Sequence, residues 1–565
     1  MPLLQWYYGS AMYVRAKTFK NKNGSQRTYL QIVQTERAGK SVRQRVIANL
    51  GRLDEMQTGP IDNLIASLAR FSKREWVRKE ALAIEARSAK SWGAALVFER
   101  LWRELGLKQS VEALLCRGSY EADYAEAIFA MVLNRLCEPA SKLRVSDWIR
   151  SVYRPGWERL ELQHFYRALD LLEGHKDEIE MALYARLCDL FDLKLDLVLW
   201  DTTSTYFEGD QAGMGEYGFS KDRRPDRLQV VVGVLMSRYG LPIAHEVFPG
   251  STADVDTFGK ALEVMKQRYQ VSRVILVADR GMVSKKVLCE IEAAGLEYIV
   301  GVRMRRSSVA QDVLSQVKQY TEIAENLKVA EVDRDGLRYI VCLNPEQQER
   351  DSALRQQLLS SLRHRIESGD ARSLIGNKGY KRYLKVESSS LQIDEARAER
   401  EAMYDGLYML VTNSGLSAAE AAIAYKSLWQ VERAFRELKT GLELRPVYHY
   451  AERRIRGHIM VCFLALVLEM VMRCKLRQHG EDAIRWEDMM QSLQEIRAVE
   501  IAVGDKRYLA RTEAGTLAMQ AFSALGMRPP ERVREMAPST GADGQECSGT
   551  RQPLLFPGQH GWPFA

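Results

Sequence analysis

Two aspartates in the 565-residue chain each follow a short apolar run with the composition of a buried strand. Asp201 follows Leu195–Trp200, and Asp279 follows Val274–Ala278. Ligands of open α/β sheets bind beyond the carboxyl ends of the strands, so the two carboxylates would meet if these strands were neighbours. Aspartate is also common in turns, and either residue taken alone is better explained as the start of a loop. Their matched settings favour a shared site.

A third carboxylate, Glu432, lies in a segment with helical periodicity. Residues 417–420 form a capping box that opens one long helix, and Gly441 with Pro446 closes it. At about 100° per residue, one narrow stripe of this helix carries Glu432 with two aromatic and two basic side chains: Tyr425, Trp429, Arg436 and Lys439. The stripe could be a solvated face with a Glu432–Arg436 ion pair worth only about 0.2–0.5 kcal/mol. However, a solvated face has little use for two aromatic side chains.

Carboxylates of this kind suit Mg²⁺, which prefers oxygen ligands and keeps waters and substrate phosphates in its shell. Two such ions roughly 3.5–4 Å apart activate the attacking oxygen and stabilise the leaving oxygen in phosphodiester cleavage. We therefore expect Asp201, Asp279 and Glu432 to be catalytic and metal-binding. Asp201 would bridge two Mg²⁺ ions, and Mn²⁺ would substitute for them.

Basic and aromatic side chains near the carboxylates are candidate contacts to double-stranded DNA. Cations would neutralise phosphates beside the metals, and aromatic rings would stack on an unpaired base at a cleaved end. The predicted DNA-binding residues are Tyr425, Trp429, Arg436, Lys439, Lys221, Arg223, Arg224 and Arg280. Asp222 and Asp226 dilute the charge around Lys221, so a plain polar loop is the alternative there.

Four further polar residues have a structural interpretation that we favour. His245 ends a strand and is expected to be a satisfied structural histidine, and Asp254 is expected to cap a helix. His449 and His458 follow the long helix, where structural or phosphate contacts are favoured over metal ligation.

The stripe Tyr425-x-x-Leu428-x-x-x-Glu432-x-x-x-x-x-x-Lys439 resembles the Tyr-Arg-Glu-Lys motif of bacterial insertion-sequence transposases of the Asp-Asp-Glu class. Further stretches resemble one subgroup of these enzymes: Ala48–Leu53, Gly218–Asp226, His245–Gly250, Asp279–Met282 and Arg445–His449. The resemblance covers roughly residues 10–525. It implies an RNase H-like core with the glutamate on a helix after an inserted segment. It also implies metal-dependent strand cleavage and strand transfer, binding to terminal inverted repeats and target DNA, and a homo-oligomer on DNA.

Two positions depart from the family pattern. Leu428 stands at the motif's arginine, whose charge Arg433 or Arg436 would have to supply, and Ser251 stands where asparagine is expected. Neither change removes a proposed metal ligand. Two alternatives remain open: a catalytically inactive, transposase-derived DNA-binding protein, and a glycosidase that uses paired carboxylates without metal.

The elements that position these residues change character along the chain. Residues 1–50 alternate apolar and polar side chains around turns, Asp62–Lys90 and 456–525 have helical patterns, and Pro, Gly and Ser dominate after Arg528. We therefore expect a basic β-rich domain over 1–60, a helical DNA-binding region over 61–190, an RNase H-like α/β core over 191–304 and 404–480, an insertion over 305–403, a C-terminal helical region over 481–527 and a disordered tail over 528–565.

Composition sets the remaining limits. The net charge is +7, and the first 50 residues hold nine basic side chains against one acidic, so the basic lobe suits a polyanion. The eight cysteines show no metal-binding spacing, and no signal peptide opens the chain, so a cytoplasmic, nucleoid-associated protein is expected. The apolar run Ile459–Met472 is too short to span a membrane and contains Glu469, which predicts a buried helix.

Overall fold

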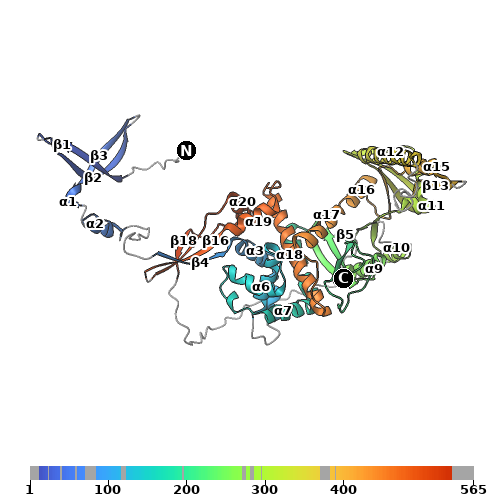
Figure 1. Cartoon of the computed structure of the whole chain (residues 1–565), viewed down its shortest axis with the longest axis horizontal. Helices are drawn as coiled ribbons and strands as arrows, with labels where there is room; N and C mark the ends of the chain where they lie inside the picture. Colours follow the sequence, from blue (N-terminus) through green and yellow to red (C-terminus); the bar gives the residue numbers. More distant parts are fainter. Residues whose placement is uncertain are drawn as a thin grey trace, which may run out of the picture. The chain divides into compact units, whose positions relative to one another are not determined.

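The computed structural model divides into two compact units, Met1–Ile84 and Glu85–Ala565, and each is described by itself (Figure 1). The structure describes residues 12–22, 24–38, 41–56, 60–69, 71, 84–115, 123–193, 196–269, 275–279, 285–293, 295–368, 382–387, 390–504 and 506–536. Among these residues, no helix combines the length and the apolar character needed to cross a membrane.

The first unit is an antiparallel sheet of order β1–β2–β3 followed by two short helices. Its elements are β1 (Met12–Lys20), β2 (Gln26–Ala38), β3 (Ser41–Arg52), α1 (Leu53–Met56) and α2 (Pro60–Ala69). Gly24 turns the chain between β1 and β2 with a φ of +81°, which glycine adopts without steric cost. The predicted small antiparallel sheet in this basic segment is therefore confirmed.

Helices dominate the start of the second unit. They are α3 (Gly93–Glu104), α4 (Leu107–Leu115), α5 (Tyr124–Cys137), α6 (Lys142–Trp148), α7 (Leu162–Gly174) and α8 (Lys176–Phe191). A later helix, α18 (Glu452–Gln478), packs against α5 and α7. Every residue of α18 from Ile459 to Met472 is buried, so the apolar run is a buried helix, as its sequence predicts.

A mixed sheet forms the centre of the second unit, with nine strands in the described residues in the order β10–β11–β12–β15–β9–β8–β5–β6–β7. These strands are β5 (Leu197–Tyr206), β6 (Gln229–Ser237), β7 (Pro242–Pro249), β8 (Ile275–Ala278), β9 (Glu297–Gly301), β10 (Thr321–Ala324), β11 (Leu327–Arg334), β12 (Leu337–Leu343) and β15 (Leu407–Thr412). β5 pairs antiparallel with β6 and parallel with β8, and β8 pairs parallel with β9. The connecting helices are α9 (Asp254–Arg268) and α10 (Lys285–Ala293). The two strands that precede Asp201 and Asp279 are therefore neighbours.

The two faces of the sheet bury separate cores, because successive side chains of a strand point to opposite sides. Leu199 of β5 and Val277 of β8 face the core shared with the helices and α18. Trp200 faces the opposite core, which includes residues of α9 and α10. Asp201 and Asp279 each stand two residues after Leu199 and Val277. Both carboxylates therefore belong to the face covered by the helices.

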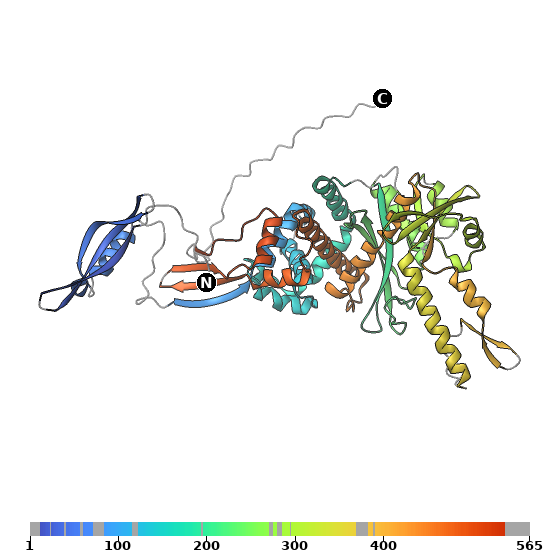
Figure 2. The ribbon, with the colours of Figure 1, turned by 90° about the horizontal axis from the view of Figure 1, so that it is seen from above.

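Part of the segment expected as an insertion, residues 305–403, extends the central sheet. β11 and β12 turn at Asp335 and Gly336, with φ of 52° and 76°, and β12 then pairs with β15. The other elements are α11 (Ser308–Gln316), α12 (Pro345–Glu367), β13 (Leu384–Glu387), β14 (Ser390–Ile393) and α15 (Glu395–Ala402). α12 and the β13–β14 pair enclose a small core of their own, and Figure 2 shows them projecting from one end of the sheet.

Three strands lie where the sequence predicted helix, and a fourth lies where it predicted disorder. β4 (Ile84–Ser91), β16 (Arg497–Val503), β17 (Lys506–Arg511) and β18 (Val533–Glu535) form a sheet of order β18–β17–β16–β4. The helical predictions at β4, β16 and β17 are therefore wrong, as is the predicted disorder at β18. Residues 537–565 of the expected tail lie outside the described residues.

The signal for β16 and β17 is present in the sequence. Val499, Ile501 and Val503 recur with a period of two before Gly504, which turns the chain with a φ of +59°. β4 and β18 carry no such alternation, because their strand form depends on pairing with distant neighbours in the sheet. The helices of this region are α19 (Trp486–Glu495) and α20 (Thr516–Ala524).

Candidate active site

Asp201 lies in the middle of β5 and not at its end. The β-branched residues that follow it continue the pairing with β6 as far as Tyr206, so the prediction that the strand ends at Asp201 is wrong. The parallel ladder pairs Leu199 with Val277. Asp201 is two residues further along β5, and Asp279 is two residues beyond Val277, just after the end of β8, so the two aspartates follow neighbouring strands that lie about 4.8 Å apart. Their side chains leave the same face of the sheet.

Burial destabilises the charged form of Asp201. Together with smaller contributions from the charges of Asp279 and Asp254, it raises the pKa of Asp201 to about 6. Lys221 and the backbone N–H of Thr202, which donates to Asp201 Oδ1 at 2.7 Å, act in the opposite direction. The charged form of Asp201 is therefore destabilised in the cleft, and a bound cation would stabilise it.

Lys221 is held beside β5 by Thr202 and Asp254. Its Nζ donates to the carbonyl oxygen of Thr202 at 2.7 Å and to Thr202 Oγ1 at 3.0 Å, and lies 3.5 Å from Asp254 Oδ1. Thr202 Oγ1 donates to Asp254 Oδ1 at 2.6 Å. Asp254 is thus the first residue of α9 and a partner of Thr202, and the prediction that it caps the helix is wrong.

The long helix predicted to carry Glu432 is two α-helices and a π-helical turn. α16 (Ala418–Lys426) opens with the predicted capping box, in which Ser417 and Glu420 satisfy each other's backbone N–H groups. A turn at Ser427 and Leu428 separates it from α17 (Trp429–Arg436), which continues as a π-helix over Glu437–Gly441. The prediction of one regular helix is therefore wrong.

The π-helical turn begins directly after Arg436, so Lys439 does not continue the stripe of Tyr425, Trp429, Glu432 and Arg436. Its wider hydrogen bonds, such as Leu442 N–H to the Glu437 carbonyl at 2.8 Å, shift the side chains that follow out of the 3.6-residue pattern. Arg436 is exposed on α17. Lys439 lies within the turn and donates to Asp222 Oδ1 at 2.7 Å, with its side chain only 11% exposed.

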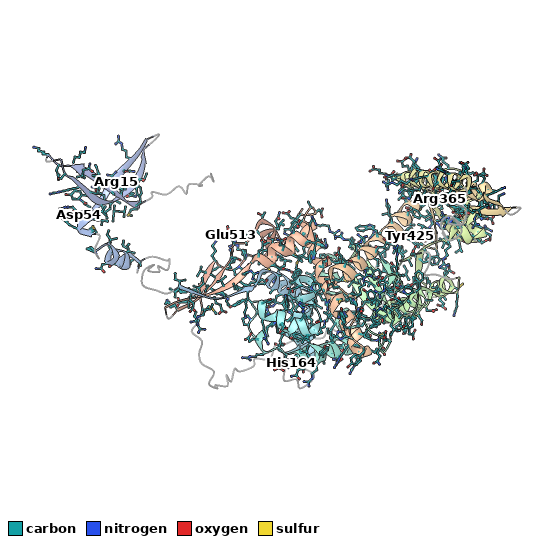
Figure 3. The ribbon with its side chains drawn as sticks, viewed as in Figure 1. Arg15, Asp54, His164, Arg365, Tyr425 and Glu513 are labelled. Atoms are coloured by element: carbon teal, nitrogen blue, oxygen red, sulfur yellow. The ribbon has the colours of Figure 1, made fainter. Side chains whose placement is uncertain are left out.

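One cleft of about 420 Å³ joins the three carboxylates. Asp201, Asp279 and Glu432 all line it, together with Tyr425 and Trp429. The Tyr425 hydroxyl donates to Asp279 Oδ1 at 2.8 Å, while its ring stacks on Tyr408 of β15 with centroids 5.8 Å apart. Figure 3 labels Tyr425 at the end of α16, beside the central sheet. Trp429 is 53% exposed at the same cleft.

The donor set of the cleft fits a hard divalent cation, held by fewer than three side chains. In the described part of the chain, no three His, Cys, Asp or Glu residues converge closely enough to hold a single ion. Mg²⁺ is usually bound by one or two carboxylates, with waters and substrate phosphates completing its shell. Two aspartates beside neighbouring strands, with a glutamate across the same cleft, match that pattern.

The other predicted DNA contacts differ in how they are held. Arg224 makes a surface ion pair with Asp226 at 2.9 Å and lies over the ring of Tyr206, whereas Arg223 is exposed with a φ of 59°. Arg280 lies outside the described residues.

His245 is buried with a structural role, as predicted, but it is not fully satisfied, since its Nε2 has no hydrogen-bond partner among the described residues. Its Nδ1 lies 2.7 Å from Glu180 Oε1, and both side chains are almost completely buried. Lys176 and Arg268 also contact Glu180, so this carboxylate is balanced by cations away from the cleft.

Sequence reasoning missed Tyr408 and Asp222 as residues of this region. Tyr408 supports the ring of Tyr425, and only the strand pairing of β15 brings it there. Asp222 accepts from Lys439 and also pairs with Arg445, with its own side chain 3% exposed. In the sequence it looked like a surface acid in a charged loop, and no local signal marks it as buried.

Two parts of the chain match known protein families. Residues 14–81 match the IS1634 family transposase, N-terminal domain, and residues 194–468 match the transposase DDE domain. The comparison with curated proteins gave no match. The first match covers the basic antiparallel sheet. The second runs from the start of the central sheet into α18 and contains all three carboxylates of the cleft.

Proposed function

We propose a catalytic arrangement for this chain, which is a DDE-type insertion-sequence transposase that acts in DNA transposition. Enzymes of this type are polynucleotidyl transferases that bind DNA and depend on a divalent metal. In our proposal Asp201, Asp279 and Glu432 are the catalytic residues and hold two Mg²⁺ ions, for which Mn²⁺ substitutes. The observation that carries the proposal is that the three carboxylates line one cleft, with Asp201 on β5 and Asp279 directly after the neighbouring strand β8.

The metal supplies charge neutralisation at the scissile phosphodiester, where negative charge develops during cleavage. The chain's own groups prepare the cleft for it. Asp201 is buried next to a second acid, so the pair gains free energy when a cation arrives. Tyr425 orients Asp279 through its hydroxyl, and the stacked Tyr408 restricts the ring that carries this hydroxyl.

The exposed groups at the rim of the cleft are suited to the DNA. Trp429 offers half of its ring surface beside Glu432, which supports stacking on an unpaired base at the cleaved end. Arg436 is exposed one turn further along the helix and would neutralise a backbone phosphate. Lys221 and Arg223 would contact phosphates on the other side, at the strand that carries Asp201.

We also assign Tyr425, Glu432 and Lys439 to the Tyr-Arg-Glu-Lys motif, with Leu428 at the position of its arginine. Arg433 lines a different cavity and faces Arg473, Glu437 and Glu469, so it is poorly placed to replace that arginine. Arg436 is therefore the candidate for the missing charge.

The architecture supports an RNase H-like core for residues 191–304 and 404–480. The order β7–β6–β5–β8–β9, with the first three strands antiparallel and β5, β8 and β9 parallel, is the arrangement expected for that fold. Residues 305–403 then form the inserted segment before the catalytic helix. The basic sheet of residues 1–60 and the helices of 61–190 would recognise the terminal inverted repeats, within a homo-oligomer that assembles on DNA.

The wild-type protein, incubated with a duplex carrying the inverted repeats that flank its coding sequence, tests the proposal. We expect strand cleavage and joining to target DNA in Mg²⁺ or Mn²⁺, and none in chelator. Binding of the repeats without any metal-dependent nicking would instead identify an inactive, DNA-binding derivative.

A further inference from the structure

A second cavity, of about 610 Å³, opens between α6 and the segment that follows the π-helical turn. Most of its charged lining residues are cations, and two histidines also line it: Arg135, Lys142, Arg144 and Arg445, with His449 and His458. Two acids also line it, Glu138 and Glu443, and both are exposed at its rim. The catalytic carboxylates do not reach this cavity, and the mechanism proposed above does not use it.

Lys142 is the unusual residue of this cavity. Only 3% of the residue is exposed, yet no hydrogen bond or ion pair joins its ammonium group to another described residue. Other well-buried lysines of the chain are paired: Lys176 with Glu180 and Glu246, and Lys475 with Glu104. A buried charge without a partner is costly, so proteins rarely keep one without a use.

The neighbours of Lys142 increase its need for an anion. Burial, with a smaller contribution from the charge of Arg135, lowers the pKa of Lys142 to about 7. Arg135 donates to the carbonyl oxygens of Ala140, Leu442 and Glu443, so dipoles orient it but no carboxylate neutralises it. Burial lowers the pKa of His449 to about 3, and that of His458 is lowered for the same reason, with Lys142 and Arg135 contributing in both cases.

We propose that this cavity is a phosphate-binding site that receives a backbone phosphate of the DNA, with Lys142 as its central cation. The inference rests on the proposed function only in that the chain binds DNA. A cation is excluded as the occupant, because Lys142 and Arg135 would repel it. A phosphate would instead satisfy the free ammonium group and accept hydrogen bonds from the imidazoles and from Arg144.

Arg445 connects the cavity to the catalytic helix. It lines the cavity and at the same time pairs with Asp222, which also binds Lys439 of the π-helical turn. A phosphate bound in the cavity would therefore lie next to the ion pairs that fix the end of the catalytic helix. DNA bound there would be positioned relative to the cleft.

Full-length protein carrying Lys142→Met tests the site, with Lys108→Met as the matched control. Lys108 is in the same helical region but makes an ordinary surface pair with Glu112. Methionine matches the unbranched aliphatic part of the lysine side chain and removes the charged group. Without phosphate, Lys142→Met should melt at a higher temperature than the wild type. A lower melting temperature would mean that Lys142 has a partner in the folded protein, and would overturn the proposal.

Inorganic phosphate and the DNA duplex then separate the two sources of phosphate. Inorganic phosphate should raise the melting temperature of the wild type and of Lys108→Met, but not of Lys142→Met. Equal effects on all three would overturn the site. On the duplex, Lys142→Met should make the slope of log K against log salt shallower by about 0.9, the effect of one lost phosphate contact. An unchanged slope would overturn DNA as the source. Neither measurement involves cleavage, so a failure of the proposed catalytic residues would be seen separately.

Discussion

Asp222 binds two cations near the catalytic helix, and Asp222→Asn tests whether Lys439 belongs to the fold or contacts DNA directly. The Asp222 side chain is 3% exposed, Lys439 Nζ donates to it at 2.7 Å, and Arg445 also contacts it. Removing one partner of a buried ion pair leaves an uncompensated charge and costs about 3–5 kcal/mol. Since an amide still accepts one hydrogen bond, we expect a loss near the lower end, about 3 kcal/mol.

Urea unfolding measures this loss as a shift of the transition midpoint. Lys439→Met should destabilise the protein as well, and the double variant should lose at least about 1 kcal/mol less than the sum of the two single losses. Asp226→Asn is the matched control. It lies in the same loop, but its pair with Arg224 is on the surface, so its midpoint should stay at the wild-type value.

The structural role of Lys439 would be refuted if Asp222→Asn unfolded at the same urea concentration as the wild type and if Lys439→Met reduced only the salt dependence of DNA binding. Lys439 would then be a phosphate contact, as the sequence motif suggests, and its pair with Asp222 would contribute nothing to the fold.

Two further changes have defined outcomes. Tyr425→Phe keeps the ring on Tyr408 but removes the hydrogen bond to Asp279, a bond to a charged group worth about 1.5–3 kcal/mol. Cleavage should therefore slow at least about 10-fold with DNA binding unchanged, and a wild-type rate would contradict this role. Glu469 is 1% exposed, and burial raises its pKa from 4.5 to about 7, so its contribution to stability falls as pH rises from about 4.5 to 7. At pH 8, Glu469→Gln should raise the melting temperature, and the gain in the free energy of unfolding should be at most about 3 kcal/mol. At pH 4.5 the substitution should have little effect. An equal effect at both pH values would contradict this assignment.

The sequence was sufficient to locate the two strands beside the aspartates, and it favoured a shared site without fixing that the strands are neighbours. Continuous apolar runs before Asp201 and Asp279 indicated central strands, and the register confirms their neighbourhood. The end of the first strand was misjudged. A run of Thr and Ser after Asp201 has no apolar alternation, although its β-branched members pair well with β6.

The helix of Glu432 shows the limit of periodicity. A stripe counted at 3.6 residues per turn correctly groups Tyr425, Trp429 and Glu432 on one cleft, even across the turn at Leu428. It fails for Lys439, because the π-helical turn depends on packing and on the distant partner Asp222. Neither of these can be read from the residues of the helix itself.

The sequence also did not reveal the partners or the burial of several charged side chains. Nothing in it indicated the protein groups that hold Lys221 and Lys439, which donate hydrogen bonds to Thr202 and to Asp222. Lys142 attracted no notice, because a single lysine at the start of a helix is common. Its significance depends on burial beside Arg135 and two histidines, His449 and His458, and the histidines lie far from it in sequence.

The most direct test of the catalytic proposal compares cleavage and DNA binding in Asp201→Asn, Asp279→Asn and Glu432→Gln. Asp196→Asn is the control, since this aspartate precedes β5 on the surface and pairs with Arg238 at 2.8 Å. Each of the three variants should bind the inverted repeats as the wild type does, yet cleave at least about 100-fold more slowly in saturating Mg²⁺, while the control cleaves normally. Full cleavage by any one of the three would contradict the assignment of Asp201, Asp279 and Glu432 as the catalytic carboxylates.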